Sequence, residues 1–370
     1  MVHAPTGEVG VAIVGGGLAG ALLALALRQD GSAVALVDPR FAAGGAAGAI
    51  ASATAISYGA MPGWALAPTP LARLAAGASR RWRRLQEHHG DLGWRPQRLS
   101  LHGERSGLSA LTRALPLPFA QVDTAVLAAR LPQVLAAAGV QLIPVVAAAL
   151  APAAAGQGWR LQWADGGGCH ADQVVLAAGA WSRTLWPALP ERLRCSWAAV
   201  LDLPVVPAGL PAKGAWLPQR FARVALERRA PELEQPHWLV DPGLVPRGEG
   251  ALLGQLSLIR PGGALDPAPA AEWLEQQLRS GLAADAWGAA MAAQPGVLRQ
   301  APVAFCTGRA PLVGPVEPEQ GLWVFCGFSA GFSQVPVLAP LLAQRLVAPP
   351  PRARRAERRL QQLGVWTRGG

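Results

Sequence analysis

The chain opens with apolar blocks that alternate with glycines. An apolar run at 9–14 is followed by a glycine-rich turn, an alanine- and leucine-rich stretch at 21–29, and a second apolar run at 33–37. Short apolar runs are typical of strands buried on both faces, and the alanine and leucine stretch is typical of a helix. The pattern therefore predicts a strand–helix–strand unit, the building block of a parallel sheet.

Three glycines and an acidic residue in this unit match a dinucleotide-binding fingerprint. Gly15, Gly17 and Gly20 have the G-x-G-x-x-G spacing, and Asp38 ends the second strand. In such a motif the first glycine permits a tight turn, the second lets a pyrophosphate approach the backbone, and the third lets helix and strand pack closely. The helix N-terminus would bind the phosphates and Asp38 a ribose hydroxyl. A glycine-rich turn without a ligand is the alternative interpretation.

Helices and strands continue to alternate up to about residue 180. Amphipathic stretches predict helices at 69–95 and 123–139. Apolar runs predict strands at 140–146, 159–163 and 173–176, with a hairpin turn at 165–168.

The pattern changes from about residue 195 to 265, where prolines and glycines separate short strand-like runs. This favours an antiparallel sheet in a second domain. A helix at 270–282 follows, and a strand at 322–326 and a helix from 335 to 346 return to the first domain. The expected fold class is α/β, with a discontinuous Rossmann-like domain and a second, mostly antiparallel β-sheet domain. The predicted division assigns 7–95, 120–194 and 296–348 to the first domain, 96–119 and 195–295 to the second, and 349–370 to a basic C-terminal tail.

Charge adds one candidate surface. The chain has 33 basic and 23 acidic side chains, a formal net charge of +10, while 51% hydrophobic residues exclude a disordered chain. Five arginines cluster near the C-terminus: Arg352, Arg354, Arg355, Arg358 and Arg359. Such a cluster can bind the phosphates of nucleic acid or anionic lipid. Most charge runs are solvated surface, however, and this second interpretation is favoured.

The sequence predicts neither a metal site nor a membrane segment. The four cysteines form no C-x-x-C pair, which fits a reducing compartment. His88 and His89 are adjacent and cannot face the same way on a helix, so they do not indicate a metal site. Glycines and prolines interrupt the long apolar stretches, and we expect a cytoplasmic protein without a membrane partner.

Three separated stretches, 13–20 with Asp38, 174–182 and 310–332, occur in a recognisable order and spacing. Together they resemble the D-amino-acid oxidase superfamily of FAD-dependent oxidoreductases. That superfamily includes glycine oxidase, sarcosine oxidase and the oxidase half of the tRNA wobble-uridine methylaminomethyl enzyme. The similarity covers most of the chain.

The resemblance implies that the first domain binds FAD and the second binds the substrate. It also implies hydride transfer from a carbon bearing an amine to the flavin, with oxygen as the acceptor of the electrons. The residues that it implies for cofactor binding are Gly15, Gly17, Gly20, Asp38, Ser52, Thr54, Val146, Ala178, Gly179, Gly327, Phe328, Ser329 and Gly331.

The substrate side departs from the family pattern. Val303 stands where amino-acid oxidases of the family carry an arginine for the substrate carboxylate, and Gly243 stands where a tyrosine is common. Tyr58 is the only tyrosine of the chain. The catalytic residues are therefore left open, with Arg247, Arg260, Arg299 and His237 as candidates.

We expect a FAD-dependent oxidoreductase that oxidises a C–N bond of a small amine or amino-acid-like substrate. Two alternatives stay open. The net charge and the arginine cluster would suit a tRNA-modifying FAD oxidase of the same superfamily. Val303 and Gly243 would suit a flavin-binding member without oxidase activity.

Overall fold

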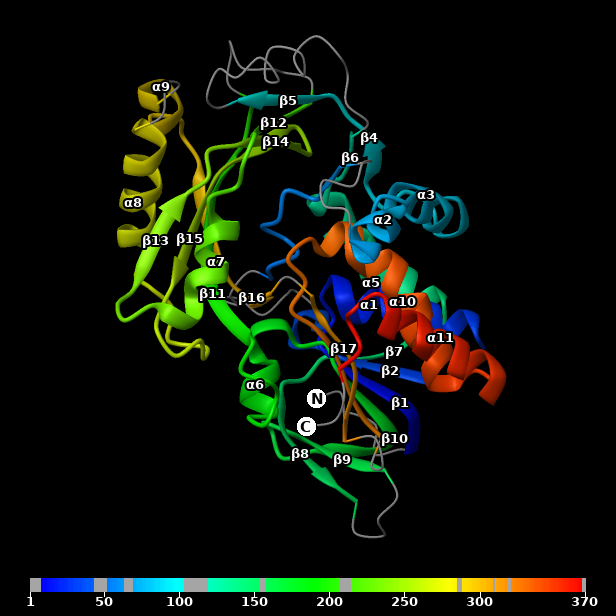
Figure 1. Cartoon of the computed structure of the whole chain (residues 1–370). Coiled ribbons are helices and arrows are strands. Elements are labelled where there is room, and N and C mark those ends of the chain that lie inside the picture. The colour runs from blue at the N-terminus through cyan, green and yellow to red at the C-terminus, as the bar shows by residue number, and fades with distance from the viewer. Residues whose placement is uncertain are drawn as a thin grey trace.

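The computed structural model describes residues 8–42, 52–62, 69–102, 119–153, 158–206, 214–284, 288–308, 310–317 and 321–367. Residues 103–118, all of which the sequence assigned to the second domain, lie outside this set. Figure 1 shows two sheets side by side, each with helices packed beside it.

The first sheet has eight strands in the described part of the chain, with β17-β18-β10-β1-β2-β7 as its main order. Its central pairs are parallel, and Ile13 lies between Leu36 and Val175. The strands are β1 (Glu8–Val14), β2 (Val34–Val37), β7 (Gln141–Ile143), β8 (Ala147–Pro152), β9 (Trp159–Trp163), β10 (Gly168–Leu176), β17 (Leu312–Glu317) and β18 (Leu322–Cys326). The predicted strand at 173–176 is thus the end of a longer one.

Both faces of this sheet are buried, as the continuous apolar runs predict. Val11 and Ile13 of β1 belong to one apolar cluster, and Ala12 and Val14 belong to another. The first cluster includes helices α1 (Leu18–Gln29), α5 (Thr124–Ala137) and α10 (Gly331–Val347). The second includes the β8–β9 hairpin, whose Trp159 is fully buried.

The helix predicted at 69–95 is instead two helices and a short strand: α2 (Pro70–Ala75), α3 (Ala78–His89) and β4 (Trp94–Pro96). Gly77 separates the helices, and Gly90 and Gly93 have positive φ angles that end the helical run. Trp82 of α3 donates a hydrogen bond to the carbonyl oxygen of Phe332, at 2.8 Å, which joins α3 to α10. Strand β4 joins β3 (Ala60–Pro62) and β6 (Phe119–Val122) in a small sheet.

The second sheet confirms the predicted, mostly antiparallel architecture. Its order is β16-β11-β15-β14-β12-β5, with β13 paired to β15, and the β12–β5 pair is parallel. The strands are β5 (Leu99–His102), β11 (Leu193–Leu203), β12 (Ala215–Pro218), β13 (His237–Val240), β14 (Leu244–Arg247), β15 (Gly250–Ile259) and β16 (Val297–Cys306). Strand β16 pairs with β11 over its whole length, so the chain leaves the second sheet after Cys306 and not at residue 296 as we expected.

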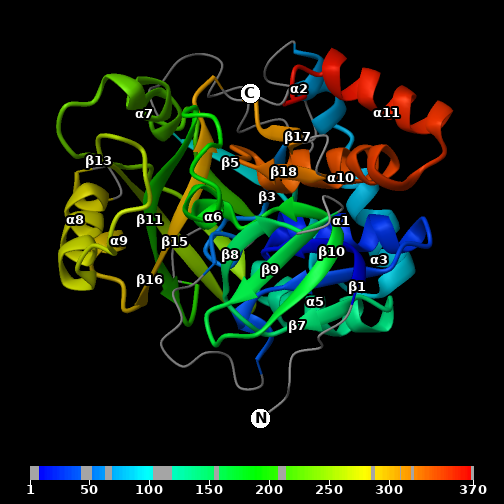
Figure 2. The ribbon, with the colours of Figure 1, turned by 90° about the horizontal axis from the view of Figure 1, so that it is seen from below.

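The two faces of the second sheet have different neighbours. Helix α8 (Ala271–Ala283) and α9 (Gly288–Ala292) cover the outer face, as Figure 2 shows. The inner face carries a separate apolar cluster that includes Val200, Val245 and Ala301 together with Tyr58. Short helices α6 (Ser182–Leu185) and α7 (Arg223–Arg229) complete this part of the chain.

The arginine-rich segment that the sequence set apart as a tail folds onto the first sheet. Helix α11 (Pro350–Gln362) buries Ala356 and Leu360 against α10. Beyond it, the amide of Thr367 donates to the carbonyl oxygen of Val313 in β17, at 3.0 Å. The apolar side of α11 explains this docking, because removing these side chains from water favours the packing of α11 against α10. None of the helices in the described residues has the length and apolar character needed to cross a bilayer.

Candidate cofactor and substrate site

The carboxyl ends of β1 and β10 meet at a turn that only glycine can form. Gly15 has a φ of +108°, and a Cβ there would lie 2.4 Å from the carbonyl oxygen of Ala177. A Cβ at Gly20 would lie 1.9 Å from the carbonyl oxygen of Gly15. Both contacts are far inside van der Waals distance, so these two glycines are needed for the turn itself.

The N-terminus of α1 opens from this turn. Gly17 is its N-cap and gives no side-chain hydrogen bond. The hydroxyl of Thr54 accepts a hydrogen bond from the amide of Leu18, at 3.0 Å. Ser52 lies two residues before Thr54, and its hydroxyl accepts from the amide of Ala55. Amides at a helix N-terminus, together with the helix dipole, favour an anionic group at this position.

Asp38 lies at the end of β2 beside the same turn. Its carboxylate is 4% exposed and accepts hydrogen bonds from the amide of Gly16, at 2.7 Å, and from Nε of Arg40, at 2.8 Å. Burial raises the pKa of this carboxyl, but the hydrogen bonds and charge of Arg40 outweigh burial, and the pKa lies below its ordinary value. Asp38 is therefore an anion fixed against the opening turn.

The mid-chain and C-terminal stretches reach the same edge of the sheet. Gly179 follows β10 with a φ of +57°, and a Cβ added there would meet no atom within 4 Å. The thiol of Cys326, at the end of β18, lies 3.4 Å from the carbonyl oxygen of Gly179. A Cβ at Gly331 would lie 3.4 Å from the side chain of Leu18, so α10 begins next to the start of α1.

The other residues implied by the resemblance lie around these turns. Ala178 immediately precedes Gly179, and Gly327 immediately follows β18. Phe328 contacts Phe325 edge to face, with ring centroids 4.8 Å apart. Val146 is half exposed, three residues after Ile143, whose carbonyl oxygen accepts from the amide of Asp38. The structure thus brings the three predicted stretches together.

These residues fit FAD. The glycine turn leaves the backbone uncovered, and two helices begin beside it with N-cap residues, Gly17 and Ala330, that form no side-chain hydrogen bond. In the first turn of α10, the buried hydroxyl of Ser333 has no hydrogen-bond partner within the described chain. Open amides suit the phosphates of the cofactor, and the fixed carboxylate of Asp38 suits a ribose hydroxyl.

The inner face of the second sheet is apolar around Val303, which packs against a cluster that includes Tyr58. The hydroxyl of Tyr58 lies above Gly243, where a Cβ would be 3.1 Å away. Burial and the nearby charge of Asp241 raise the pKa of this hydroxyl well above its usual range, although the charge of Arg223 lowers it. Tyr58, Asp241 and Arg223 therefore form a polar group at the edge of an apolar face.

Arg223 and Asp241 were not among the residues that the sequence singled out. Asp241 is 2% exposed and directly follows strand β13. An acidic residue at the end of a predicted strand is the sequence feature that could have identified it. Its carboxylate accepts hydrogen bonds from the backbone amides of Ala222, at 2.6 Å, and Arg223, at 3.0 Å. Burial raises the pKa of Asp241, against the lowering effect of these bonds and of the Arg223 charge.

The four candidate catalytic side chains have other neighbours. Arg247 and Arg299 both bind the carboxylate of Asp202, at 2.7 and 3.3 Å. Arg260 is partly buried and donates to the carbonyl oxygen of Pro267, and His237 is exposed at the start of β13. The structure gives none of them a hydrogen bond to residues 327–331 among the contacts of the described chain.

The cysteines near the site are buried thiols. Cys306 and Cys326 lie at the ends of β16 and β18, and burial raises their pKa values to about 12 and about 11. Thiols with such pKa values stay protonated at neutral pH and are poor nucleophiles. No group of three or more histidine, cysteine or acidic residues within the described ranges could hold a metal ion.

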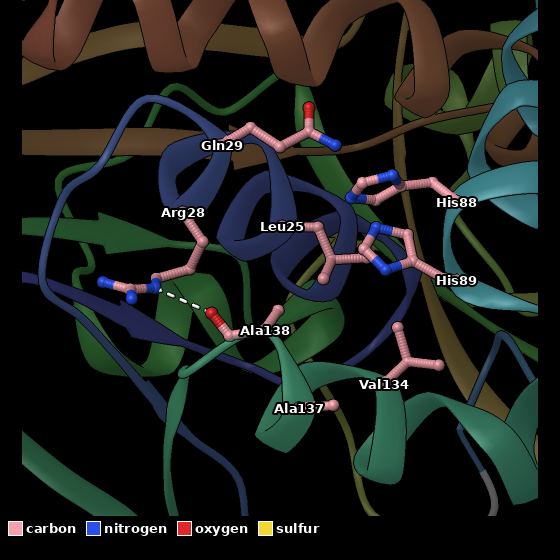
Figure 3. A pocket seen from close by; sticks show the side chains of 8 residues that line it. All are labelled: Leu25, Arg28, Gln29, His88, His89, Val134, Ala137 and Ala138. Atoms are coloured by element: carbon pink, nitrogen blue, oxygen red, sulfur yellow. Dashed lines mark hydrogen bonds between the residues drawn. The ribbon is translucent and has the colours of Figure 1, made fainter.

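A groove of about 440 Å³ lies elsewhere, between α1, α3 and α5 (Figure 3). It is lined by Arg28 and Gln29 at the far end of α1, and by His88 and His89, whose rings meet edge to face. Arg28 donates to the carbonyl oxygen of Ala138, at 2.9 Å. Because α1 has 12 residues, its far end, where Arg28 and Gln29 lie, is about 18 Å from its start at the glycine turn.

Comparisons with known proteins agree with this arrangement. A family model described as FAD dependent oxidoreductase matches residues 10–117 and 103–345. No curated protein sequence matches the chain. Among solved structures, glycine oxidase from Geobacillus kaustophilus is 21% identical, with a TM-score of 0.64 over 92% of this chain and 94% of that one.

Two further structures share the fold. Iminodiacetate oxidase from Chelativorans sp. BNC1 is 19% identical, with a TM-score of 0.63 over 90% of this chain and 94% of that one. L-proline dehydrogenase from P. horikoshii is 12% identical, with a TM-score of 0.65 over 98% of this chain and 100% of that one.

Proposed function

The chain belongs to the family of FAD dependent oxidoreductases, and we propose that it oxidises a C–N bond of a small amine or amino-acid-like substrate. The observation that carries this proposal is the meeting of two helix N-termini, those of α1 and α10, with the glycine turn, beside the inner face of the second sheet. A cofactor held at the turn would lie next to a surface able to hold a small organic molecule.

The proposed residue roles follow from this geometry. Gly15, Gly17 and Gly20 keep the turn open for the pyrophosphate, and Thr54 holds the first amide of α1, that of Leu18. Asp38 would accept a ribose hydroxyl. When bound, FAD supplies a two-electron acceptor for the amine carbon. The apolar side chains around Val303 exclude water from the inner face of the second sheet.

The names of the structural neighbours support the substrate class. Glycine, iminodiacetate and L-proline each carry a carbon bonded to nitrogen, as the proposed reaction requires. Two of the three neighbours are named oxidases, which supports oxygen as the electron acceptor, and one is named a dehydrogenase. We therefore include oxygen in the proposal as the acceptor to be tested.

An anaerobic reduction screen tests the proposal. Protein loaded with FAD is mixed without oxygen with glycine, sarcosine, L-proline, iminodiacetate and simple amines, and the visible absorption of the flavin is followed. We expect at least one compound to bleach it, and oxygen to restore it with release of peroxide. A fully loaded protein that no compound reduces would contradict the proposed oxidation.

A modified RNA base is the second candidate substrate. The five clustered arginines of α11 are all exposed, because the helix buries Ala356 and Leu360 on its other side. Arginines on one exposed surface can bind the phosphates of RNA. Binding of tRNA should then weaken steeply with salt and fall in the Arg354→Gln/Arg355→Gln/Arg358→Gln variant. Absence of tRNA binding at low salt would remove this candidate.

A further inference from the structure

Arg223 is the first residue of α7, in the link between β12 and β13. Figure 1 shows α7 on the side of the second sheet that faces away from α8. From this position Arg223 reaches the first domain, where its Nη2 donates to the carbonyl oxygen of Ser329, at 3.4 Å. Ser329 belongs to the 327–331 segment that we assign to the cofactor, so the Arg223 side chain lies between that segment and the second sheet.

The guanidinium of Arg223 is only partly satisfied. Nη1 donates to Glu227, at 3.0 Å, and Nη2 makes the long bond to Ser329. Nε is buried and has no hydrogen-bond partner in the described chain. A buried donor of a charged group without an acceptor is unfavourable, and residues 8–367, in the parts that the structure describes, leave this atom without one.

Nε and Nη2 form one edge of the guanidinium, and two other arginines of this chain show what that edge binds. Arg40 presents Nε and Nη2 to the carboxylate of Asp38. Arg279 presents the same two atoms to Glu275. In Arg223 the Nη2 atom of the same edge donates to Ser329, and no carboxylate of the described residues is bound to this edge.

The surroundings hold Arg223 in place. The carboxylate of Asp241 accepts hydrogen bonds from the backbone amides of Arg223 and Ala222, and these two bonds fix the start of α7. The guanidinium carbon lies 5.6 Å from the ring centroid of Phe221, and the side chain is 22% exposed. Glu227 neutralises the Nη1 side, while the Nε side remains without an anion. A fixed, planar group of this kind is suited to a bidentate carboxylate.

We propose that Arg223 binds the carboxylate of the substrate through Nε and Nη2, which makes the substrate an amino acid rather than a simple amine. This inference rests on the proposed function, because it places the substrate between the 327–331 segment and the second sheet. Arg223 is then the specificity-determining cation of the site, although it lies on α7 and not at Val303. Asp241 is a positioning residue that acts through the start of α7.

Carboxylate binding tests the inference apart from turnover. FAD-loaded protein is titrated with acetate and with acetamide, its neutral analogue, and the shift of the flavin absorption gives the dissociation constant. We expect acetate to bind and acetamide not to bind. Arg223→Gln should weaken acetate about 100-fold, since loss of one partner of a buried charged pair has effects of this size. Arg228→Gln, an exposed change on the same helix, should have no effect.

Arg223→Lys keeps the charge but loses the planar edge. It should weaken the binding of acetate about 10-fold, and it replaces Arg223→Gln in the experiment if that variant does not fold. If wild-type protein binds FAD but not acetate, or if both Arg223 variants bind acetate as tightly as Arg228→Gln does, the inference is wrong. Failure of the protein to bind FAD at all would instead contradict the proposed function.

A substrate pair gives the second readout. With the best amino acid from the reduction screen, Arg223→Gln should raise the concentration needed for half-maximal flavin reduction. The amide of that amino acid should be a poor substrate for wild-type protein and be little affected by the substitution. Equal losses for the acid and its amide would indicate a structural role only and would overturn the inference.

Discussion

The hydroxyl of Tyr58 donates a hydrogen bond to the carbonyl oxygen of Gly243, 3.3 Å away, although 185 positions separate the two residues in the chain. The same oxygen accepts the amide of Gly254, at 2.7 Å. Tyr58 therefore joins the loop before β3 to the start of β14, and it occupies the space that a side chain at position 243 would need.

This relationship predicts a coupled pair of substitutions. Tyr58→Phe should lower the free energy of unfolding by about 1 kcal/mol, because one hydrogen bond is lost and Gly243 keeps its other donor. Gly243→Ala should cost about 1–3 kcal/mol, because its Cβ would crowd the Tyr58 hydroxyl and ring. The double variant should lose less than the sum in denaturant unfolding. Strict additivity would show that the two residues do not interact.

The glycine turn predicts a separation of folding from cofactor binding. Gly20→Ala should destabilise the protein by about 2 kcal/mol or more, because its Cβ would overlap the backbone oxygen of Gly15. A Cβ at Gly17 would meet nothing nearer than the Thr54 hydroxyl, at 3.5 Å. Gly17→Ala should therefore fold with nearly unchanged stability but bind FAD more weakly. Thermal unfolding and FAD titration of both variants check this, and equal effects on stability would contradict it.

The docking of α11 predicts that its apolar side supports the first domain. Leu360 is fully buried, and Leu360→Ala should cost about 2–5 kcal/mol through the cavity that it leaves. Exposed Arg359→Ala is the matched control and should change stability by less than about 0.5 kcal/mol. Denaturant unfolding followed by tryptophan fluorescence measures both, since Trp366 lies just beyond the helix. A neutral Leu360→Ala variant would mean that α11 is detached in solution.

The same docking has a charged component. The guanidinium of Arg345 lies 5.0 Å from the ring centroid of Trp323 and 5.8 Å from that of Trp366, and it binds Glu357 at 2.8 Å. Both residues of this ion pair are only about one-third exposed, so salt screens the pair weakly, and the pair helps to fix the position of α11 against α10. Added salt should therefore change the free energy of unfolding of wild-type protein less than it changes the free energy of tRNA binding.

Asp38 predicts an acid-sensitive component of stability. Its pKa in the folded protein lies below the ordinary value of 3.8, so folding favours the charged form. The stability that it contributes is present above pH 3.8 and is lost as the pH falls through the lower folded pKa. In Asp38→Asn the free energy of unfolding should fall less steeply with decreasing pH over this acid range. The exposed substitution Asp172→Asn is the control, and its free energy of unfolding should depend on pH as that of wild-type protein does. Identical profiles for wild type and Asp38→Asn would contradict the assignment.

The sequence predicted the features that depend on near neighbours. The strand–turn–helix at Gly15 and Gly20 follows from contacts within a few residues and with one adjacent strand. The change to an antiparallel sheet after residue 195 follows from the spacing of prolines and glycines. The apolar spacing of Ala356, Leu360 and Leu363 was visible among the arginines, and it would have shown that α11 has a side to bury.

The substrate side could not be predicted in the same way. Arg223 and Ser329 are 106 positions apart, and only the packing of α7 against the first domain brings them together. Asp202 binds Arg247 and Arg299 from a third strand, which no local pattern indicates. Pairings of this kind depend on how the two sheets are placed, and sequence periodicity carries no information about that placement.

Retention of FAD is the most direct test of the central claim, that one cofactor binds along the glycine turn. Purified protein is incubated with FAD and desalted, and its visible absorption is compared with its protein content. The account predicts about one flavin for each chain in wild-type protein, and a clear loss in Gly17→Ala. Wild-type protein that is folded but retains no flavin would contradict the account.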